Sequence, residues 1–300
     1  MTTQHHVIRT RLKGQQIDTP HGRVYANEMP GDDPLIVLMH GFPDDHRIYD
    51  RLIPRLSPRR AVAFDFVGYG RSDRPERTEF SSQAHGDQIT AVLDSLQAGR
   101  AVLVGQDASG PDAVTYAITH PQRIAHLVLL NTVFGNQPSL IMPEMTRLFS
   151  DPQLKALADD MVGDPNQLLW LLQRWGVQFE LDADDPFGII RNSILPQFYG
   201  DEHQPDAIAS IRAWCAELRP ALNHQDDLVN NGAVRDLQLP VSIIWGTNDR
   251  SLSSSLAHEI AALFDKSSLY LLPDAGHYPQ HDQPDQVAEL MKNCETVRPV

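Results

Sequence analysis

The chain has 300 residues, which is enough for one large domain or for a domain that carries an insertion. Its hydrophobic share of 41% fits a globular protein, and its formal net charge of −14 argues against nucleic acids and anionic membranes as partners. The two cysteines, Cys215 and Cys294, fit neither a disulfide framework nor a zinc site. Because no stretch has the pattern of a signal peptide or a membrane span, we expect a cytoplasmic protein.

Short apolar runs alternate with helical patterns along most of the chain. The first half predicts two strands within 7–29 and further strands at 35–39, 61–65, 101–105 and 124–130, with helices at 44–56, 82–97 and 111–120. The last part predicts strands at 241–245 and 268–272, with helices at 253–264 and 284–293. This alternation predicts the α/β class, with a mainly parallel sheet and helices on both of its faces.

Between residues 134 and 235 the pattern changes. We find no convincing strand there, and the segment is rich in Leu, Trp, Asp and Pro, which predicts several short helices. Ligands of open α/β sheets bind at the carboxyl edge of the strands. We therefore predict a core formed by residues 1–133 and 236–300, and a helical cap formed by residues 134–235 over that edge.

A strand, a tight turn and a helix follow one another around Asp107. The turn reads Gly105-Gln106-Asp107-Ala108-Ser109, and its small residues allow it to close. This arrangement is typical of a nucleophile elbow, and the N-terminus of the following helix favours an anion. The alternative is that Asp107 only caps the helix. A serine nucleophile at Ser109 is a weaker alternative, because the elbow spacing would then require glycine at position 107.

Two further residues follow later strands in the order that a catalytic set requires. Asp249 follows the strand 241–245, and His277 follows the strand 268–272. Alone, each is an ordinary turn or surface residue. Together with Asp107 they form a nucleophile, an acid that orients the imidazole, and a base. The backbone N–H groups of Phe42 and Ala108 are the expected oxyanion hole.

These motifs resemble the α/β-hydrolase fold, and within it the branch with an aspartate nucleophile, the epoxide hydrolases and haloalkane dehalogenases. The resemblance rests on His40-Gly41-Phe42-Pro43, on Gly68-Tyr69-Gly70-Arg71-Ser72-Asp73, and on Asp107, Asp249 and His277. It covers roughly residues 35–131 and 241–285 and matches the predicted cap poorly. It implies a hydrolase with no cofactor and no metal.

An aspartate nucleophile suits alkylating substrates. Its attack on an sp³ carbon gives an alkyl ester, and water activated by His277 then attacks the carbonyl of that ester. We therefore expect an epoxide hydrolase that converts an epoxide to a diol. A haloalkane or haloacid dehalogenase is the second hypothesis. It would need an atypical halide site, because Ala108 stands where the resemblance implies a halide-binding Trp. A ligand-binding protein without turnover is the third hypothesis.

The resemblance to epoxide hydrolases also implies a proton donor in the cap, usually a pair of tyrosines. Tyr199 is the candidate donor, with His203 or His224 as a second donor, and Cys215 stands where the family carries a Tyr. Trp170, Trp175 and His203 are expected to bind substrate, although the two indoles suit helix packing equally well. The expected partners are a small apolar electrophile and water, with a homodimer left open.

Overall fold

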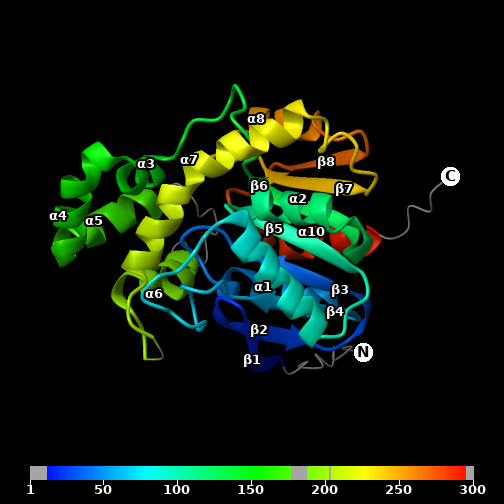
Figure 1. Ribbon diagram of the computed structural model, residues 1–300, viewed down its shortest axis with the longest axis horizontal. Helices are drawn as coiled ribbons and strands as arrows, with labels where there is room; N and C mark the ends of the chain where they lie inside the picture. Colours follow the sequence, from blue (N-terminus) through cyan, green and yellow to red (C-terminus); the bar gives the residue numbers. More distant parts are fainter. Residues whose placement is uncertain (1–11, 177–187, 203, 295–300) are drawn as a thin grey trace, which may run out of the picture.

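The computed structural model describes residues 12–176, 188–202 and 204–294. At its centre lies an eight-stranded sheet in the order β1-β2-β4-β3-β5-β6-β7-β8 (Figure 1). The strands are β1 (Lys13–Thr19), β2 (Gly22–Met29), β3 (Asp32–Met39), β4 (Arg59–Phe64), β5 (Ala101–Asp107), β6 (Ile124–Thr132), β7 (Val241–Gly246) and β8 (Ser267–Leu272). Strand β2 pairs antiparallel with β1 and β4, and all other pairs are parallel. The sheet confirms the predicted α/β class.

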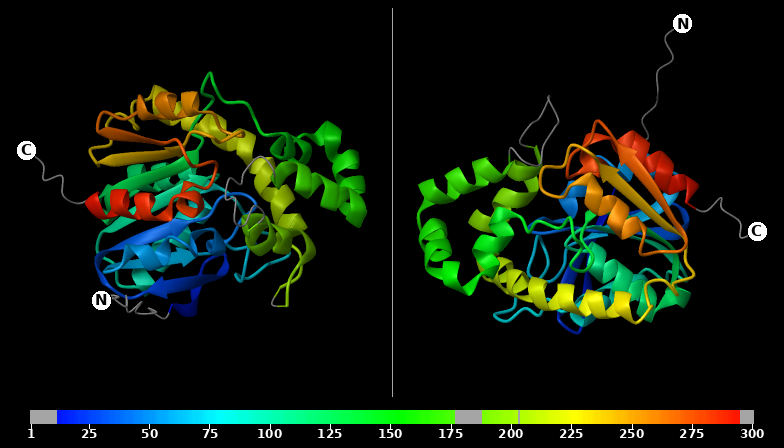
Figure 2. Two further views of the ribbon diagram at one scale, coloured as in Figure 1. Left: turned by 180° about the vertical axis from the view of Figure 1, so that it is seen from behind. Right: turned by 90° about the horizontal axis from the view of Figure 1, so that it is seen from above.

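Helices cover both faces of this sheet. Helices α1 (Ser82–Ser95) and α2 (Gly110–Thr119) lie on one face, and α10 (Pro284–Asn293) lies on the other (Figures 1 and 2). Helix α8 (Ser254–Ala261) packs against β7 and β8. The central strands are apolar on both sides as a result, and the residues of β5 from Ala101 to Gln106 are all buried. Burial on both faces explains why these strands read as continuous apolar runs.

The stretch 44–56 differs from the helix that the sequence predicts. It forms two short 3₁₀ turns, η1 (His46–Tyr49) and η2 (Ile53–Leu56). Pro54 lies in the first turn of η2 and has no N–H for an α-helical ladder. The Asp45 side chain caps η1 by accepting from the N–H of Arg47. The local bonding therefore favours two separate turns.

The described residues between β6 and β7 form several helices and no strand, as the sequence predicts. It contains α3 (Glu144–Ser150), α4 (Lys155–Gly163), α5 (Pro165–Gly176), α6 (Leu195–Tyr199) and α7 (Ile208–Asn230), with the short turns η4 (Pro152–Leu154) and η5 (Ile190–Ile194). We call residues 144–230 the helical segment. It extends to one side of the sheet, and α7 runs back from it toward the sheet (Figure 1). The boundaries 134 and 235 stay a prediction.

Two short elements complete the fold, η3 (Pro121–Arg123) and α9 (Pro279–Asp282). None of the described helices combines the length and the hydropathy that crossing a bilayer requires.

Asp45 joins the core to the helical segment. Its N–H donates to Ser193 Oγ over 2.9 Å, and Gln197 Nε2 donates to Asp45 Oδ2 over 2.9 Å. The Arg47 guanidinium forms an ion pair with the same carboxylate. Since the Asp45 side chain is fully buried, its charge depends on these partners.

We expect Asp45→Ala to lower the free energy of unfolding by about 3 kcal/mol, because it leaves the partners of a buried ion pair uncompensated. Urea unfolding measures the change. The control is Lys155→Ala, which breaks an exposed pair with Asp159 and should cost less than about 0.5 kcal/mol. Equal losses in the two variants would contradict the role of Asp45.

Candidate active site

The turn after β5 holds Asp107 in a strained backbone conformation. Its φ is +49°, a left-handed value that side chains other than glycine rarely adopt. The turn closes tightly, since a Cβ at Gly105 would lie 2.7 Å from the Cα of Gly110. Helix α2 begins directly behind the turn, so Asp107 stands at the carboxyl edge of the sheet as the elbow motif predicts.

The Asp107 carboxylate lies on backbone donors. The N–H of Phe42 donates to Oδ2 over 3.0 Å, and the N–H of Ala108 also donates to this carboxylate. The two loops fit closely, because a Cβ at Gly41 would lie 2.5 Å from the Cβ of Asp107. The expected oxyanion donors thus bind the side chain of Asp107 itself.

Both alternatives for this turn fit the structure less well. The N-cap position of α2 belongs to Ser109, not to Asp107. The Ser109 hydroxyl is buried and donates to the carbonyl groups of Met39 and Gln106, at 3.1 and 2.9 Å. It is therefore a structural group of the elbow and has no base beside it among these contacts.

His277 and Asp249 come to the same edge from the loops after β8 and β7. His277 Nδ1 lies 2.8 Å from Asp249 Oδ2, and His277 Nε2 lies 3.7 Å from Asp107 Oδ1. The side chains of His277 and Asp249 are 4% and 0% exposed, against 18% for Asp107. The structure therefore brings the three predicted residues together, and Asp107, the predicted nucleophile, is the most exposed of them.

Further groups hold the Asp249 carboxylate in place. The N–H groups of Ser251 and Leu252 donate to Oδ1 over 2.7 and 2.9 Å. Asn131, at the end of β6, donates from Nδ2 to Oδ2 over 2.8 Å. These donors fix the position of the Asp249 carboxylate, which in turn orients the imidazole.

The electrostatics of the site follow from carboxylates gathered around one imidazole. Burial disfavours the imidazolium, but the charge and hydrogen bond of Asp249 outweigh it and, with Asp107 and Asp44, raise the pKa of His277 to about 9. Burial raises the pKa of Asp107, although His277 and the N–H groups of Phe42 and Ala108 oppose this shift. The resting site therefore holds an imidazolium beside the nucleophile at neutral pH.

Asp44 is a residue of this site that the sequence reasoning missed. It is buried, and the Tyr278 hydroxyl is 3.2 Å from each of its carboxylate oxygens. Burial and then the charge of Asp107 raise its pKa well above the usual range, which favours the protonated carboxyl. Its position directly after His40-Gly41-Phe42-Pro43 is the signal that could have revealed it.

Helix α7 presents Trp214 and Cys215 to the core. The Trp214 ring lies 6.0 Å from that of Phe42 and 5.3 Å from that of Tyr69, measured between centroids. Cys215 is fully buried, and burial together with the Asp107 charge raises the pKa of its thiol. The thiol is therefore neutral, and it lies within electrostatic reach of the nucleophile.

Tyr199 lies at the surface of the helical segment. The side chain is 49% exposed, and its hydroxyl donates to the carbonyl of Pro165 over 3.3 Å, within the helical segment. This bond joins the hydroxyl to α5, and the role of Tyr199 as a proton donor stays a prediction. His224 is exposed on α7, and His203 lies outside the described residues.

The two tryptophans of α5 take different positions. Trp170 is 57% exposed and lines an open groove whose other wall includes Asp249 and Ser251. Trp175 is 7% exposed and packs in the interior of the helical segment. A substrate contact of either indole stays a prediction.

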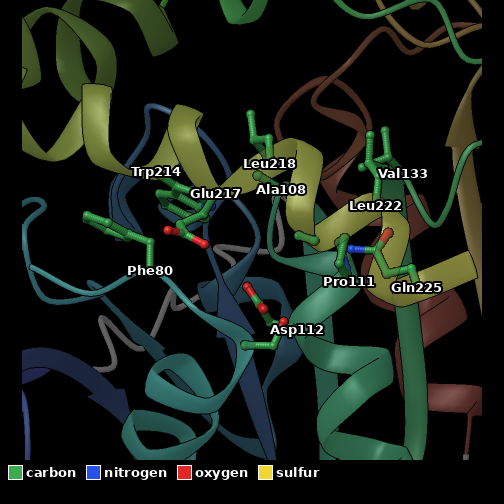
Figure 3. A pocket seen from close by; sticks show the side chains of 12 residues that line it. Phe80, Ala108, Pro111, Asp112, Val133, Trp214, Glu217, Leu218, Leu222 and Gln225 are labelled. Carbon is green, nitrogen blue, oxygen red and sulfur yellow. The ribbon is translucent and has the colours of Figure 1, made fainter. Parts of the chain in front are cut away.

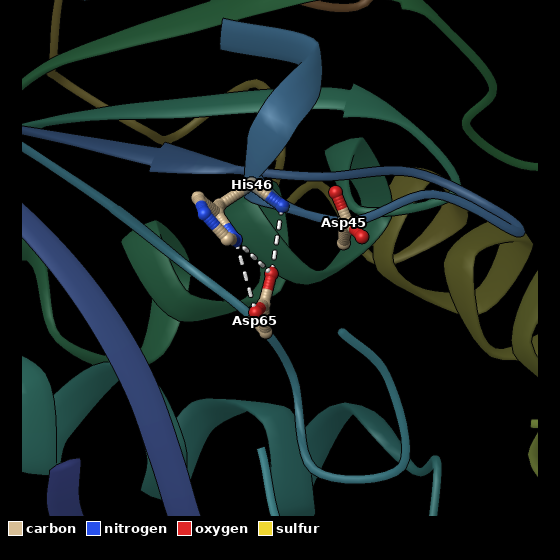
Figure 4. A group of neighbouring side chains, drawn as sticks. All are labelled: Asp45, His46 and Asp65. Carbon is tan, nitrogen blue, oxygen red and sulfur yellow. Dashed lines mark hydrogen bonds and ion pairs between the residues drawn. The ribbon is translucent and has the colours of Figure 1, made fainter. Parts of the chain in front are cut away.

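A cluster of Asp45, His46 and Asp65 has the residue types of a metal site (Figure 4). Its donor atoms are already engaged, since His46 Nδ1 lies 2.8 Å from Asp65 Oδ1 and the Asp45 carboxylate binds Arg47 and Gln197. Burial opposes protonation of His46, but Asp65 outweighs it and raises the pKa of His46 to about 9. These contacts fit a structural ion pair between His46 and Asp65.

Comparison with known proteins agrees with this geometry. The model of the alpha/beta hydrolase fold family matches residues 34–284. Haloalkane dehalogenase 2 of Mycobacterium bovis is 29% identical over 285 residues, which cover 92% of this chain and 93% of that protein. Epoxide hydrolase 3 of Xenopus tropicalis is 24% identical over 282 residues, covering 87% and 71% of the two chains.

A solved structure shares the fold at low sequence identity. An epoxide hydrolase from Bacillus megaterium superimposes with a TM-score of 0.72 at 20% identity, covering 94% of this chain and 100% of the other. The family match spans most of the chain and contains Asp107, Asp249 and His277. The protein therefore belongs to the α/β-hydrolase family.

Proposed function

We propose that this protein is a hydrolase that forms an alkyl ester on Asp107, and that its substrate is an epoxide, which it converts to a diol. One observation carries the proposal. The N–H groups of Phe42 and Ala108 bind the Asp107 carboxylate, and His277 Nε2 stands 3.7 Å from its Oδ1. With a serine nucleophile, by contrast, these donors would receive an oxygen of the substrate.

The first step uses the two carboxylate oxygens differently. Because Oδ2 accepts from Phe42, Oδ1 is the oxygen that attacks the ring carbon. The Oδ1–carbon bond forms while the ring carbon–oxygen bond breaks, and the electron pair goes to the ring oxygen, which takes a proton. Asp44 and Cys215 hold protons near Asp107, since burial raises the pKa of both groups.

The second step restores the enzyme. His277 first releases its resting proton to solvent. Water then adds to the Asp107 carbonyl carbon and gives a proton to the neutral imidazole, while the oxyanion develops on Oδ2 against the N–H groups of Phe42 and Ala108. The bond from the carbonyl carbon to Oδ1 then breaks, and Oδ1 leaves with the diol after taking the proton from His277. The proton left on the new Asp107 carboxyl and the proton released earlier to solvent restore His277 and the group that protonated the ring oxygen. Alkylation has already removed the Asp107 charge, which is one of the charges that raise the His277 pKa. The first step thus makes the imidazole a better base for the second.

A dehalogenase is the second candidate, because haloalkane dehalogenase 2 is similar over 92% of this chain. A departing halide needs no proton, and the Tyr199 hydroxyl is already bound to the carbonyl of Pro165. Ala108 argues against it, because this residue offers no side-chain N–H beside Asp107 to hold a halide.

Incubation with styrene oxide and with 1-bromobutane distinguishes the candidates. We expect diol from the epoxide and little halide from the bromide. Halide release without diol would replace the proposal with the dehalogenase. Ligand-dependent shifts of the melting temperature with neither product would favour a protein that binds without turnover.

We expect His277→Gln to accumulate the alkyl-enzyme, because the ester still forms and lacks its base. Intact-protein mass spectrometry after incubation with styrene oxide should show the added mass of one substrate. Asp107→Ala is the matched control and should show no adduct. An adduct on Asp107→Ala of the same size would contradict the assignment of the nucleophile.

The His277 pKa also predicts how stability depends on pH. Its value in the fold is about 9, against an ordinary 6.5, so the folded protein binds this proton more tightly than the unfolded chain does. The resulting stabilisation is complete below pH 6.5 and is lost as the pH rises to about 9. Urea unfolding of His277→Gln should show a weaker loss of stability over this range, and an unchanged slope would contradict the shift.

A further inference from the structure

An open groove runs between the helical segment and the loop that follows β7. Its walls come from α3 and the chain before it, from α5, and from residues 249–253. The groove contains about 1590 Å³ free of protein atoms, part of it open to solvent. Sites for small molecules typically have roughly 300–1,000 Å³, so the groove has room for one. Asp107 is not among the described residues that line it.

Arginines outnumber acids in this groove, which we call the arginine groove. The charged side chains that line it are Arg147, Arg174, Arg250, Glu144 and Asp249. Arg174 and Glu144 neutralise each other in an ion pair at 3.0 Å, and the Asp249 side chain is buried against His277. The described lining therefore has an excess of positive charge, in a chain whose formal net charge is −14.

Two sets of donors in the arginine groove are open to a ligand. Arg147, on α3, is exposed, and its guanidinium makes no hydrogen bond or ion pair with a residue that the structure describes. Ser253 lines the groove at the N-cap position of α8, and its side chain does not cap the helix. The first turn of α8, where the positive end of the helix dipole lies, therefore lacks its usual side-chain acceptor. Both features favour an anion.

The pocket between α7 and the start of α2 has the opposite sign (Figure 3). Its charged side chains are Asp112 and Glu217, and no lysine or arginine is among the described residues that line it. Asp112 already accepts from His85 Nδ1 at 2.6 Å. Positive charge is therefore concentrated in the arginine groove and is not shared by this second pocket.

The arginine groove also exposes apolar side chains. Ile141 is 79% exposed and Trp170 is 57% exposed, and both line the groove. They are the two most exposed large hydrophobic residues in the described part of the chain. Exposed apolar side chains that gather beside polar groups are typical of a binding site. The indole offers a flat apolar surface next to the cationic groups.

We propose that the arginine groove binds a small amphipathic anion, in which a carboxylate or sulfonate is attached to an apolar or aromatic body. Arg147 and the first turn of α8 attract the anionic group, and the body packs on Trp170 and Ile141. The site is independent of the proposed function, because no step at Asp107 uses these residues.

Charge is tested with naphthalene-2-sulfonate and its uncharged counterpart naphthalene-2-methanol. In calorimetry the wild type should bind the sulfonate about tenfold more tightly than the alcohol, because only the sulfonate forms charge-assisted hydrogen bonds. Arg147→Glu should remove this preference, whereas Arg235→Glu, the same change at an exposed position outside the groove, should keep it. Absence of sulfonate binding, equal affinities of the two probes, or a preference that Arg147→Glu leaves unchanged would overturn the proposal.

The apolar contact is tested on α5. Trp170→Ala should weaken sulfonate binding about fivefold, because it removes the aromatic surface under the naphthalene ring. Leu169→Ala is the matched control, since Leu169 is 45% exposed on the same helix and lies outside the groove. Equal effects of the two substitutions would contradict the assigned position of the body. Melting temperatures show whether the variants fold.

Two further measurements locate the ligand. Asp107→Ala should bind the sulfonate as tightly as the wild type does, and loss of binding in this variant would place the anion at the nucleophile and refute the groove. Vesicles that contain phosphatidylserine should not sediment the wild type. Sedimentation that Arg147→Glu abolishes would replace the small anion with a membrane surface. If the wild type turns over no epoxide and no halide, the proposed function fails, and these binding measurements still decide the proposal for the groove.

Discussion

The structure of this site depends on one carboxylate held at the edge of the sheet by backbone N–H groups and an imidazole. A buried carboxylate is costly unless donors surround it. The loop after β3 supplies the N–H of Phe42, the elbow supplies that of Ala108, and the loop after β8 supplies His277. The parallel order β3-β5-β6-β7-β8 brings these loops to one edge, so the fold gathers around Asp107 the groups that stabilise its carboxylate.

The carboxylates around His277 link the protonation of its imidazole to the state of Asp107. Asp44, Asp107 and Asp249 all act on His277, and mutual repulsion with burial raises the pKa of Asp44. The imidazolium balances the carboxylates at rest, and an ester on Asp107 would remove part of what stabilises that cation. Formation of an ester on Asp107 and the proton affinity of His277 would therefore be coupled electrostatically.

From the sequence we could predict the strands and the loops at their carboxyl ends, because these follow from local patterns and from the parallel order of the sheet. We could not predict side-chain positions that depend on contacts between distant parts of the chain. Apolar runs located the strands, and loops after strands located Asp107, Asp249 and His277, because carboxyl ends of parallel strands share an edge. Pro54 broke the helix expected at 44–56. The direction of Tyr199 follows from how α6 packs beside α5, and the role of Asp44 follows from neighbours distant in sequence, such as Tyr278. Residue spacing and hydrophobic periodicity carry no information about either of these contacts.

The measurement that tests the central claim most directly is a single turnover of styrene oxide in water enriched in heavy oxygen. The account predicts that hydrolysis leaves the water oxygen in the enzyme, because Oδ1 departs with the diol. Mass spectrometry of the peptide that contains Asp107 should therefore show the label in that carboxylate, while the first diol released carries none from the solvent. Label in the first diol and none in Asp107, after turnover is confirmed, would show that water attacks the substrate directly and would contradict the covalent role of Asp107.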